Sequence, residues 1–189
     1  MPTAPFEPPT LTDGVVTLRL ARPHDAEPMT AGLSDEGTVQ WLISVPHPYD
    51  HQESVRWVEE VAPNGWRDGT LLFLTIADAL DDRFLGEVGL THLALDEGRV
   101  EVAYWLVPGE RGRGAVRRAL RLMLAWAVDE LGVVRVDWAA RAGNEASRAA
   151  AEAVGFRFEG VRRGRFLRQY DAARYDEWVA GLLADELVR

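Results

Sequence analysis

The chain has 189 residues, of which 47% are hydrophobic, and a formal net charge of −9 at pH 7. This length suits one domain with a core of its own, and the acidic balance argues against a general nucleic-acid binder, which needs a cationic face. The chain has no cysteine and its 21 basic residues are all arginine, so disulfides, cysteine metal sites and chemistry that needs a thiolate or a lysine amine are excluded.

The opening segment MPTAPFEPPT has neither a cationic start nor an apolar run, so we expect no signal peptide and no membrane anchor. The sequence also lacks an apolar span of membrane-crossing length. These features favour a cytoplasmic protein. Residues 1–12 are rich in Pro and Thr and are predicted to be a flexible tail, followed by a single domain over residues 13–189.

The first part of the domain is predicted to contain one strand followed by helices. Val15–Leu20 is typical of a strand, and residues 24–33 form a short helix with acids in its first turn. Further helical segments are expected around Val39–Leu42 and over His51–Val61. Between them, two prolines require Val45–Tyr49 to be irregular.

Three strands are predicted next. Leu71–Ala77 and Phe84–Leu93 are separated by a turn and read as the two arms of a hairpin. Val100–Val107 alternates between branched, charged and aromatic residues, which is typical of a third antiparallel strand.

The segment Glu110–Leu131 (ERGRGAVRRALRLMLAWAVDEL) combines a glycine loop with an amphipathic helix. Gly112 and Gly114 let the backbone approach an anion closely, and the free N–H groups of the first helical turn favour phosphate. Two such glycines also occur in ordinary helix-entry turns, and some of the arginines belong to a solvated face paired with acids. The apolar residues at helical spacing are Val116, Ala119, Leu120, Met123, Leu124, Ala127, Val128 and Leu131.

The last part of the chain is predicted to return to the sheet. Val133–Ala139 is a strand, and the helical crossover before it places it parallel to the preceding strand. Asn144 caps a helix over Glu145–Val154. Phe156–Val161 and Ala172–Val179 are expected to be the final strands.

Three segments, in this order along the chain, carry a family resemblance. Arg111–Val116 (RGRGAV) is similar to a pyrophosphate loop that reads Gln or Arg, two variable residues, Gly, one variable residue, and Gly or Ala. Gly143–Arg148 (GNEASR) contains an Asn-x-x-Ser element, and Val154–Gly160 (VGFRFEG) matches an LGF…EG run. Together they resemble the GCN5-related N-acetyltransferase (GNAT) family, in its ribosomal-protein-alanine-acetyltransferase-like (RimJ/RimL-type) branch.

The resemblance covers roughly residues 14–180. It implies a mixed α/β (α+β) fold with a central twisted, mostly antiparallel sheet of six to seven strands and about four helices, splayed between strands 4 and 5 to admit the cofactor. It also implies transfer of an acetyl group from acetyl-CoA to a primary amine, by direct attack in a ternary complex.

The resemblance also implies a set of cofactor-binding residues. The backbone of Trp105, Leu106 and Val107 would hold the pantetheine arm, with one N–H polarising the thioester carbonyl. Asn144 would bind the cofactor, although a helix cap is an equally good interpretation. Val116 departs from the family pattern, and its side chain either crowds the pyrophosphate or points into the core. The pyrophosphate loop consists of Arg111, Gly112, Arg113, Gly114, Ala115 and Val116.

The catalytic residues are implied in the same way. Many relatives protonate the leaving thiolate with a tyrosine seven residues after the asparagine, but this position is Ala151. Ser147 is then the best proton donor, the alternative being a small packing residue. Glu101 is the candidate base, or an anchor for a charged substrate, or an exposed acid. A peptide α-amine has a pKa near ~8 against ~10.4 for lysine, so it needs little help from a base.

The acceptor is expected to be a cationic amine, such as a peptide or protein N-terminus or a small amine, because the body of the protein is acidic. Glu87 and His47 are candidate substrate-binding residues. No metal is expected, because the histidines are scattered without ligand spacing. Three alternatives stay open: another donor such as succinyl-CoA, a catalytically silent acyl-CoA-binding module, and a monomeric or homodimeric state.

Overall fold

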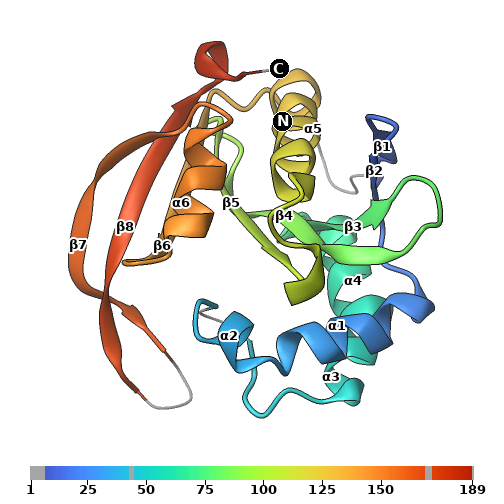
Figure 1. Ribbon diagram of the computed structural model, residues 1–189. Helices are drawn as coiled ribbons and strands as arrows, with labels where there is room; N and C mark the ends of the chain where they lie inside the picture. Colours follow the sequence, from blue (N-terminus) through green and yellow to red (C-terminus); the bar gives the residue numbers. More distant parts are fainter. Residues whose placement is uncertain (1–6, 43–44, 169–171, 189) are drawn as a thin grey trace.

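The computed structural model describes residues 7–42, 45–168 and 172–188, and its strands form one eight-stranded sheet in the order β1-β2-β3-β4-β5-β6-β8-β7. Neighbours pair antiparallel except β5 and β6, which are parallel. Figure 1 shows β7 and β8 as a long ribbon at one edge and the short β1 and β2 at the other. The strands are β1 (Leu11–Thr12), β2 (Val16–Arg19), β3 (Leu72–Asp78), β4 (Phe84–Ala94), β5 (Arg99–Leu106), β6 (Arg135–Arg141), β7 (Arg157–Leu167) and β8 (Arg174–Leu183).

Helices connect the strands. A π-helical segment, Trp57–Val61, joins α3 to α4 without a break. Of the helices in the described part of the chain, none combines the length and hydrophobicity that a membrane span requires. The α-helices are α1 (Ala26–Leu33), α2 (Glu36–Val39), α3 (His51–Arg56), α4 (Ala62–Asp68), α5 (Ala115–Leu131) and α6 (Glu145–Glu152).

Two apolar clusters hold the elements together. In the larger cluster, the buried stripe of α5 packs against residues that alternate along the central strands, such as Leu74, Val88 and Val102. In the smaller cluster, Met29 and Leu33 of α1 meet Val58 and Phe84, and Trp105 of β5 packs against them. The central strands are therefore covered on both faces.

The sheet splits between β5 and β6. These strands pair only where Arg99–Val102 lies beside Arg135–Trp138, although β5 continues to Leu106 and β6 to Arg141. We call the space between Ala103–Leu106 and Ala139–Arg141 the wedge. The expected splay between the fourth and fifth long strands is therefore present, because the two-residue β1 shifts the numbering by one.

The boundaries differ from the sequence expectations in several places. Leu11 and Thr12 pair with Leu18 and Thr17, so the predicted tail ends earlier and the sheet has eight strands rather than six to seven. The helix expected to end at Val61 continues to Asp68. Pro63 lacks an N–H for the helical ladder, and the π-helical segment lies directly before α4.

The other differences concern elements with weak hydrophobic patterns. α2 spans Glu36–Val39 instead of Val39–Leu42, and six α-helices occur in the described ranges rather than about four. β7 and β8 extend to Leu167 and Leu183. Their exposed arms are rich in arginine and glutamate, so apolar alternation did not reveal their length.

A buried ion pair joins β2 to the start of α1. The Arg19 guanidinium donates to both oxygens of Asp25, at 2.7 and 3.0 Å, and both side chains are almost fully buried. The Thr75 hydroxyl and the Arg22 backbone N–H also donate to Asp25, while Asp82 accepts from Arg19 at 2.6 Å. Every charge in this buried cluster therefore has hydrogen-bonding partners.

We expect Asp25→Asn to lower the free energy of unfolding by about 3 kcal/mol, because it leaves the buried Arg19 without its main counter-charge. Urea unfolding followed by circular dichroism measures the change. As a control, Glu152→Gln removes a surface pair with Arg148 (2.7 Å) and should cost less than about 1 kcal/mol. Equal losses in the two variants would contradict a special role for the buried pair.

Candidate active site

The peptide groups of β5 alternate between its two neighbours, as they do in any antiparallel ladder. The Val107 N–H donates to the Leu85 carbonyl at 2.9 Å, so Val107 and Trp105 direct their peptide groups toward β4. Leu106 and Tyr104 direct theirs the other way, into the wedge. Of the three residues expected to hold a pantetheine arm, only Leu106 directs its peptide groups toward the wedge. Tyr104, which the sequence analysis did not include, does the same.

Arg111 lies against β5 and α2. Its Nε and Nη2 atoms are both 3.2 Å from the Leu106 carbonyl oxygen, and Nη2 is 2.6 Å from the Thr38 hydroxyl. Its guanidinium therefore occupies the Leu106 carbonyl and connects α2 to β5. This contact is tertiary, and the loop motif gave no sign of it.

The glycine loop has the backbone geometry that the sequence predicted. Gly112 and Gly114 have φ values of 76° and 82°, which are left-handed conformations that favour glycine. Gly114 is the N-cap of α5 and carries no capping side chain. The first-turn N–H groups of this 17-residue helix therefore face the loop without a partner inside the helix.

The arginines around this loop do not all have the same surroundings. Arg113 pairs with Glu110 at 3.3 Å, and Glu110 also accepts from Arg83. Arg117 extends back toward Gly114: a Cβ placed on that glycine would lie 3.9 Å from Arg117 Nη2. Arg117 thus places a cation beside the first-turn N–H groups.

The side chain of Val116 packs against the larger apolar cluster, and the preceding Ala115 is buried in it. Of the two interpretations of this departure from the family pattern, the structure supports the inward one. Val116 therefore leaves the loop clear.

A cluster of two hydroxyls and one indole lies at the apex of the wedge. The Ser147 hydroxyl is 3.0 Å from the Tyr104 phenol oxygen, and the Trp138 Nε1 hydrogen points toward both oxygens, at 3.3 and 3.0 Å. The Tyr104 hydroxyl donates to the Ser147 carbonyl oxygen at 2.7 Å. Burial raises the pKa of Tyr104 to about 12, against hydrogen bonds from Ser147 and Trp138 that lower it.

Asn144 is the N-cap of α6, since its side-chain oxygen accepts from the Ser147 backbone N–H at 3.2 Å. The helix-cap interpretation is confirmed, and binding of a cofactor by Asn144 stays a prediction. The cap holds Ser147 in the first turn of α6, beside β5.

Glu101 lies on the opposite side of β5 from Tyr104, because side chains alternate. Its carboxylate is partly exposed and 3.7 Å from the His92 Nδ1 atom. Burial raises the pKa of Glu101; Glu177 and Asp137 act in the same direction, while His92 and Arg162 oppose them. The residue remains a candidate base on an acidic surface.

Glu87 is almost fully buried, so the structure argues against its predicted direct contact with a substrate. Its two oxygens accept from the Trp57 and Trp105 indole N–H groups, at 2.7 and 3.0 Å. Burial raises the pKa of Glu87 to about 7. This carboxylate instead connects the π-helical segment to β5 beneath the smaller apolar cluster.

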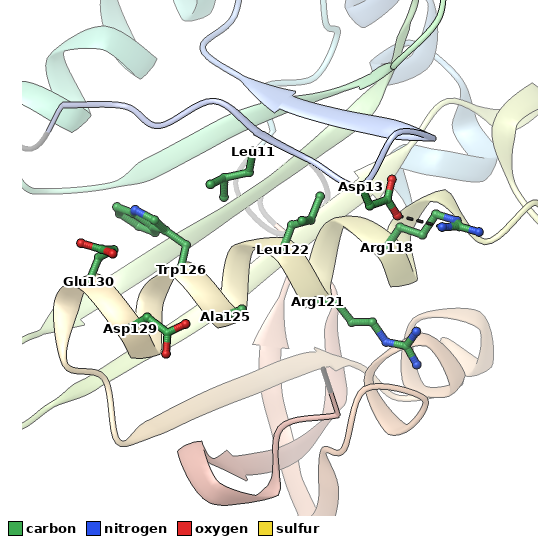
Figure 2. Close-up of a pocket in the computed structure, with 9 residues that line it drawn as sticks. All are labelled: Leu11, Asp13, Arg118, Arg121, Leu122, Ala125, Trp126, Asp129 and Glu130. Carbon is green, nitrogen blue, oxygen red and sulfur yellow. Dashed lines mark hydrogen bonds and ion pairs between the residues drawn. The ribbon is translucent and has the colours of Figure 1, made fainter.

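Two cavities lie outside the wedge. His47 lines one of about 470 Å³, together with residues of α2 and Arg168, and substrate binding there stays a prediction. The other, of about 510 Å³, runs along the outer side of α5; Figure 2 shows Arg118 paired with Asp13 and Arg121 turned away from Leu11. None of the predicted catalytic residues lines either cavity. The described residues include no group of three or more His, Asp or Glu side chains that could hold a metal ion.

Known proteins share the family and the fold of this chain. Residues 16–157 match the acetyltransferase (GNAT) domain model. YdaF of Bacillus subtilis, whose name assigns it provisionally to the ribosomal N-acetyltransferases, is 28% identical over an alignment of 155 positions. The alignment covers 78% of this chain and 81% of YdaF. RimJ of Mycobacterium smegmatis in complex with CoA-disulfide has a TM-score of 0.79 and 25% identity, covering 96% of this chain and 90% of RimJ.

A further solved structure, the self-immunity acetyltransferase MccE in complex with acetyl-CoA and AMP, has a TM-score of 0.79 and 19% identity, covering 91% of this chain and 93% of MccE. At this identity the likeness concerns the fold. The family match spans most of the chain, and the chain therefore belongs to the GNAT family of acyl-CoA-dependent N-acetyltransferases. Within the family it resembles the RimJ/RimL-type branch.

Sequence reasoning missed the partners of the expected residues. Tyr104 is two and four residues after the core positions Val102 and Val100, so it shares their face of β5 and could have been placed there from the sequence. Its contacts with Ser147 and Trp138 could not have been found, because they join residues 43 and 34 positions apart in the chain.

We expect the stability of the protein to depend on pH through Glu87. A folded-state pKa of about 7, raised from 4.5, means that folding takes up a proton between these values, so stability falls as pH rises through this window. Glu87→Gln resembles the protonated acid. Relative to this variant, the wild type should therefore lose up to about 3 kcal/mol between pH 4.5 and 7.

Urea unfolding of both proteins at several pH values measures this difference. An offset between them that stays constant from pH 4.5 to 7 would show that Glu87 is not the titrating group.

Proposed function

We propose that this enzyme transfers an acetyl group from acetyl-CoA to a primary amine, by direct attack of the amine in a ternary complex. The observation that carries the proposal is the wedge, toward which the Tyr104 peptide groups and the Leu106 N–H are directed; Arg111 already occupies the Leu106 carbonyl. The wedge lies between the glycine loop at the N-terminus of α5 and the hydroxyls of Ser147 and Tyr104 near the N-terminus of α6. A thioester held there would have its carbonyl near a backbone N–H and its sulfur near a proton donor.

The cofactor would extend from the loop into the wedge. The first-turn N–H groups of α5 and Arg117 suit the pyrophosphate, and the Leu106 N–H and the Tyr104 peptide groups suit the amide groups of the pantetheine arm. The complexes of MccE with acetyl-CoA and of RimJ with CoA-disulfide support a coenzyme A ligand. Val116 packs inward and does not block the glycine loop. It therefore gives no support to the alternative of a catalytically silent acyl-CoA-binding module.

The amine would approach from the face that carries Glu101. Asp137 and Glu177 lie on the same surface, and both are paired: Arg99 and Arg135 lie 3.3 and 2.8 Å from Asp137, and Arg162 lies 3.1 Å from Glu177. The net charge of −9 on the chain as a whole favours a cationic acceptor. The name of YdaF supports an amine of a ribosomal protein. A protein N-terminus suits the reaction because its α-amine loses its proton more readily than a lysine does.

In the reaction the amine nitrogen bonds to the thioester carbon, and the C–S bond breaks with its electron pair on sulfur. Glu101, or water beside it, accepts the proton of the amine. Ser147 donates a proton to the departing thiolate. Base and acid then act from opposite faces of β5, which keeps the carboxylate away from the developing negative charge on sulfur.

Gly114→Trp should abolish binding of acetyl-CoA, because an indole at the N-cap of α5 fills the loop. Gly132→Trp is the matched control: Gly132 ends the same helix with φ 68°, close to the 82° of Gly114, and has open space around it. Isothermal titration calorimetry with acetyl-CoA, succinyl-CoA and free coenzyme A measures binding. Wild-type protein that binds none of the three, or equal losses in both variants, would contradict the proposed site.

Glu101→Gln should separate a base from an anchor. If Glu101 accepts the proton of the amine, kcat falls about 10²-fold and recovers as the pH is raised toward the pKa of the amine. If Glu101 only attracts a cationic acceptor, KM for the amine rises while kcat is kept. Free-thiol release with a panel of peptides and small amines measures both constants, and wild-type constants in the variant would remove Glu101 from the site.

A further inference from the structure

Tyr104 is the one tyrosine at the apex of the wedge within the described residues, and it occupies a position on β5 rather than on the helix after Asn144. Its ring packs against the larger apolar cluster, and its hydroxyl lies 3.0 Å from Ser147 Oγ. The phenol therefore reaches the same point as Ser147 from the opposite wall.

The hydrogen bonds in this cluster have a definite direction. Tyr104 donates to the Ser147 carbonyl oxygen (2.7 Å), while its own oxygen faces both the Ser147 hydroxyl and the Trp138 N–H. Rotation about the phenolic C–O bond would move the Tyr104 hydrogen from the Ser147 carbonyl to Ser147 Oγ. Trp138 is 2% exposed, so its N–H is held in place beneath both oxygens.

We propose that Tyr104 is the positioning and relay partner of Ser147: it orients the serine hydroxyl and replaces the proton that Ser147 gives to the departing thiolate. This inference rests on the proposed function and adds to it a residue that acts through Ser147. The indole N–H of Trp138 stabilises the phenolate that forms.

The protons balance over one turnover. Sulfur takes the Ser147 hydroxyl proton as the C–S bond breaks, and Ser147 Oγ takes the phenolic proton of Tyr104. The proton lost by the amine passes to water, directly or through Glu101, and water returns one proton to Tyr104. The phenol suits this role because even with a raised pKa it is a stronger acid than an aliphatic hydroxyl.

A double-mutant cycle in the full chain tests the proposal. Tyr104→Phe keeps the ring, and Ser147→Ala removes the hydroxyl. Each should lower kcat about 10²-fold, with KM for acetyl-CoA unchanged, and the double variant should be no slower than either single one because the two residues act as a unit. Tyr175→Phe is the matched control, since the ring of Tyr175 stacks on Arg141 outside this cluster and its kcat should equal that of the wild type.

A second measurement separates the relay from packing. Difluorotyrosine introduced at Tyr104 keeps the ring and the hydroxyl but lowers the phenol pKa. The alkaline limb of the kcat profile should then appear at lower pH, which a packing role would not cause. An unshifted profile, a Tyr104→Phe variant with wild-type kcat, or losses that multiply in the double variant would each overturn the proposal. A wild-type protein that turns over no amine would instead sink the proposed function, and the relay with it.

Discussion

The parting of β5 from β6 is the constraint on which the candidate site depends. α5 crosses over between these two strands and makes them the only parallel pair in the described sheet, and they hydrogen-bond for four residues before they separate. Beyond Val102 and Trp138 each strand exposes peptide groups that an unbroken sheet would have paired. In the wedge, therefore, a ligand can hydrogen-bond to these peptide groups as a neighbouring strand would.

The two walls of the wedge are held at the correct distance by short polar contacts. At its apex Tyr104 of β5 meets Trp138 of β6 and Ser147 of α6. At its open end, α2 bridges the walls: Arg111 joins it to the β5 side, and Arg141 donates to the Gln40 carbonyl from the β6 side, at 3.1 Å. Figure 1 shows α2 below this opening. Such anchoring would give a thioester bound in the wedge one position relative to the hydroxyls.

Alternation along β5 separates two kinds of chemistry. Tyr104 faces the hydroxyl cluster, whereas Glu101 faces an acidic surface and Trp105 contacts the buried carboxylate of Glu87. Neighbouring residues point to opposite faces of a strand. β5 therefore carries the partner of the proposed proton donor, the candidate base Glu101 and the peptide groups that face the wedge. Glu87 contributes indirectly, because it fixes the Trp105 indole and the π-helical segment that cover this part of the sheet.

The sequence by itself determined the family, the order of the elements, the glycine loop and the cap of α6, because each depends on residues close together in the chain. The left-handed glycines 112 and 114, the amphipathic stripe of α5 and the Asn144 cap are local properties of this kind. The tertiary structure alone decided what each side chain meets. Arg111 turns to Thr38 and Leu106, Glu87 is buried between two indoles, and Tyr104 joins Ser147. These outcomes depend on the packing of distant segments, whose geometry local spacing does not encode.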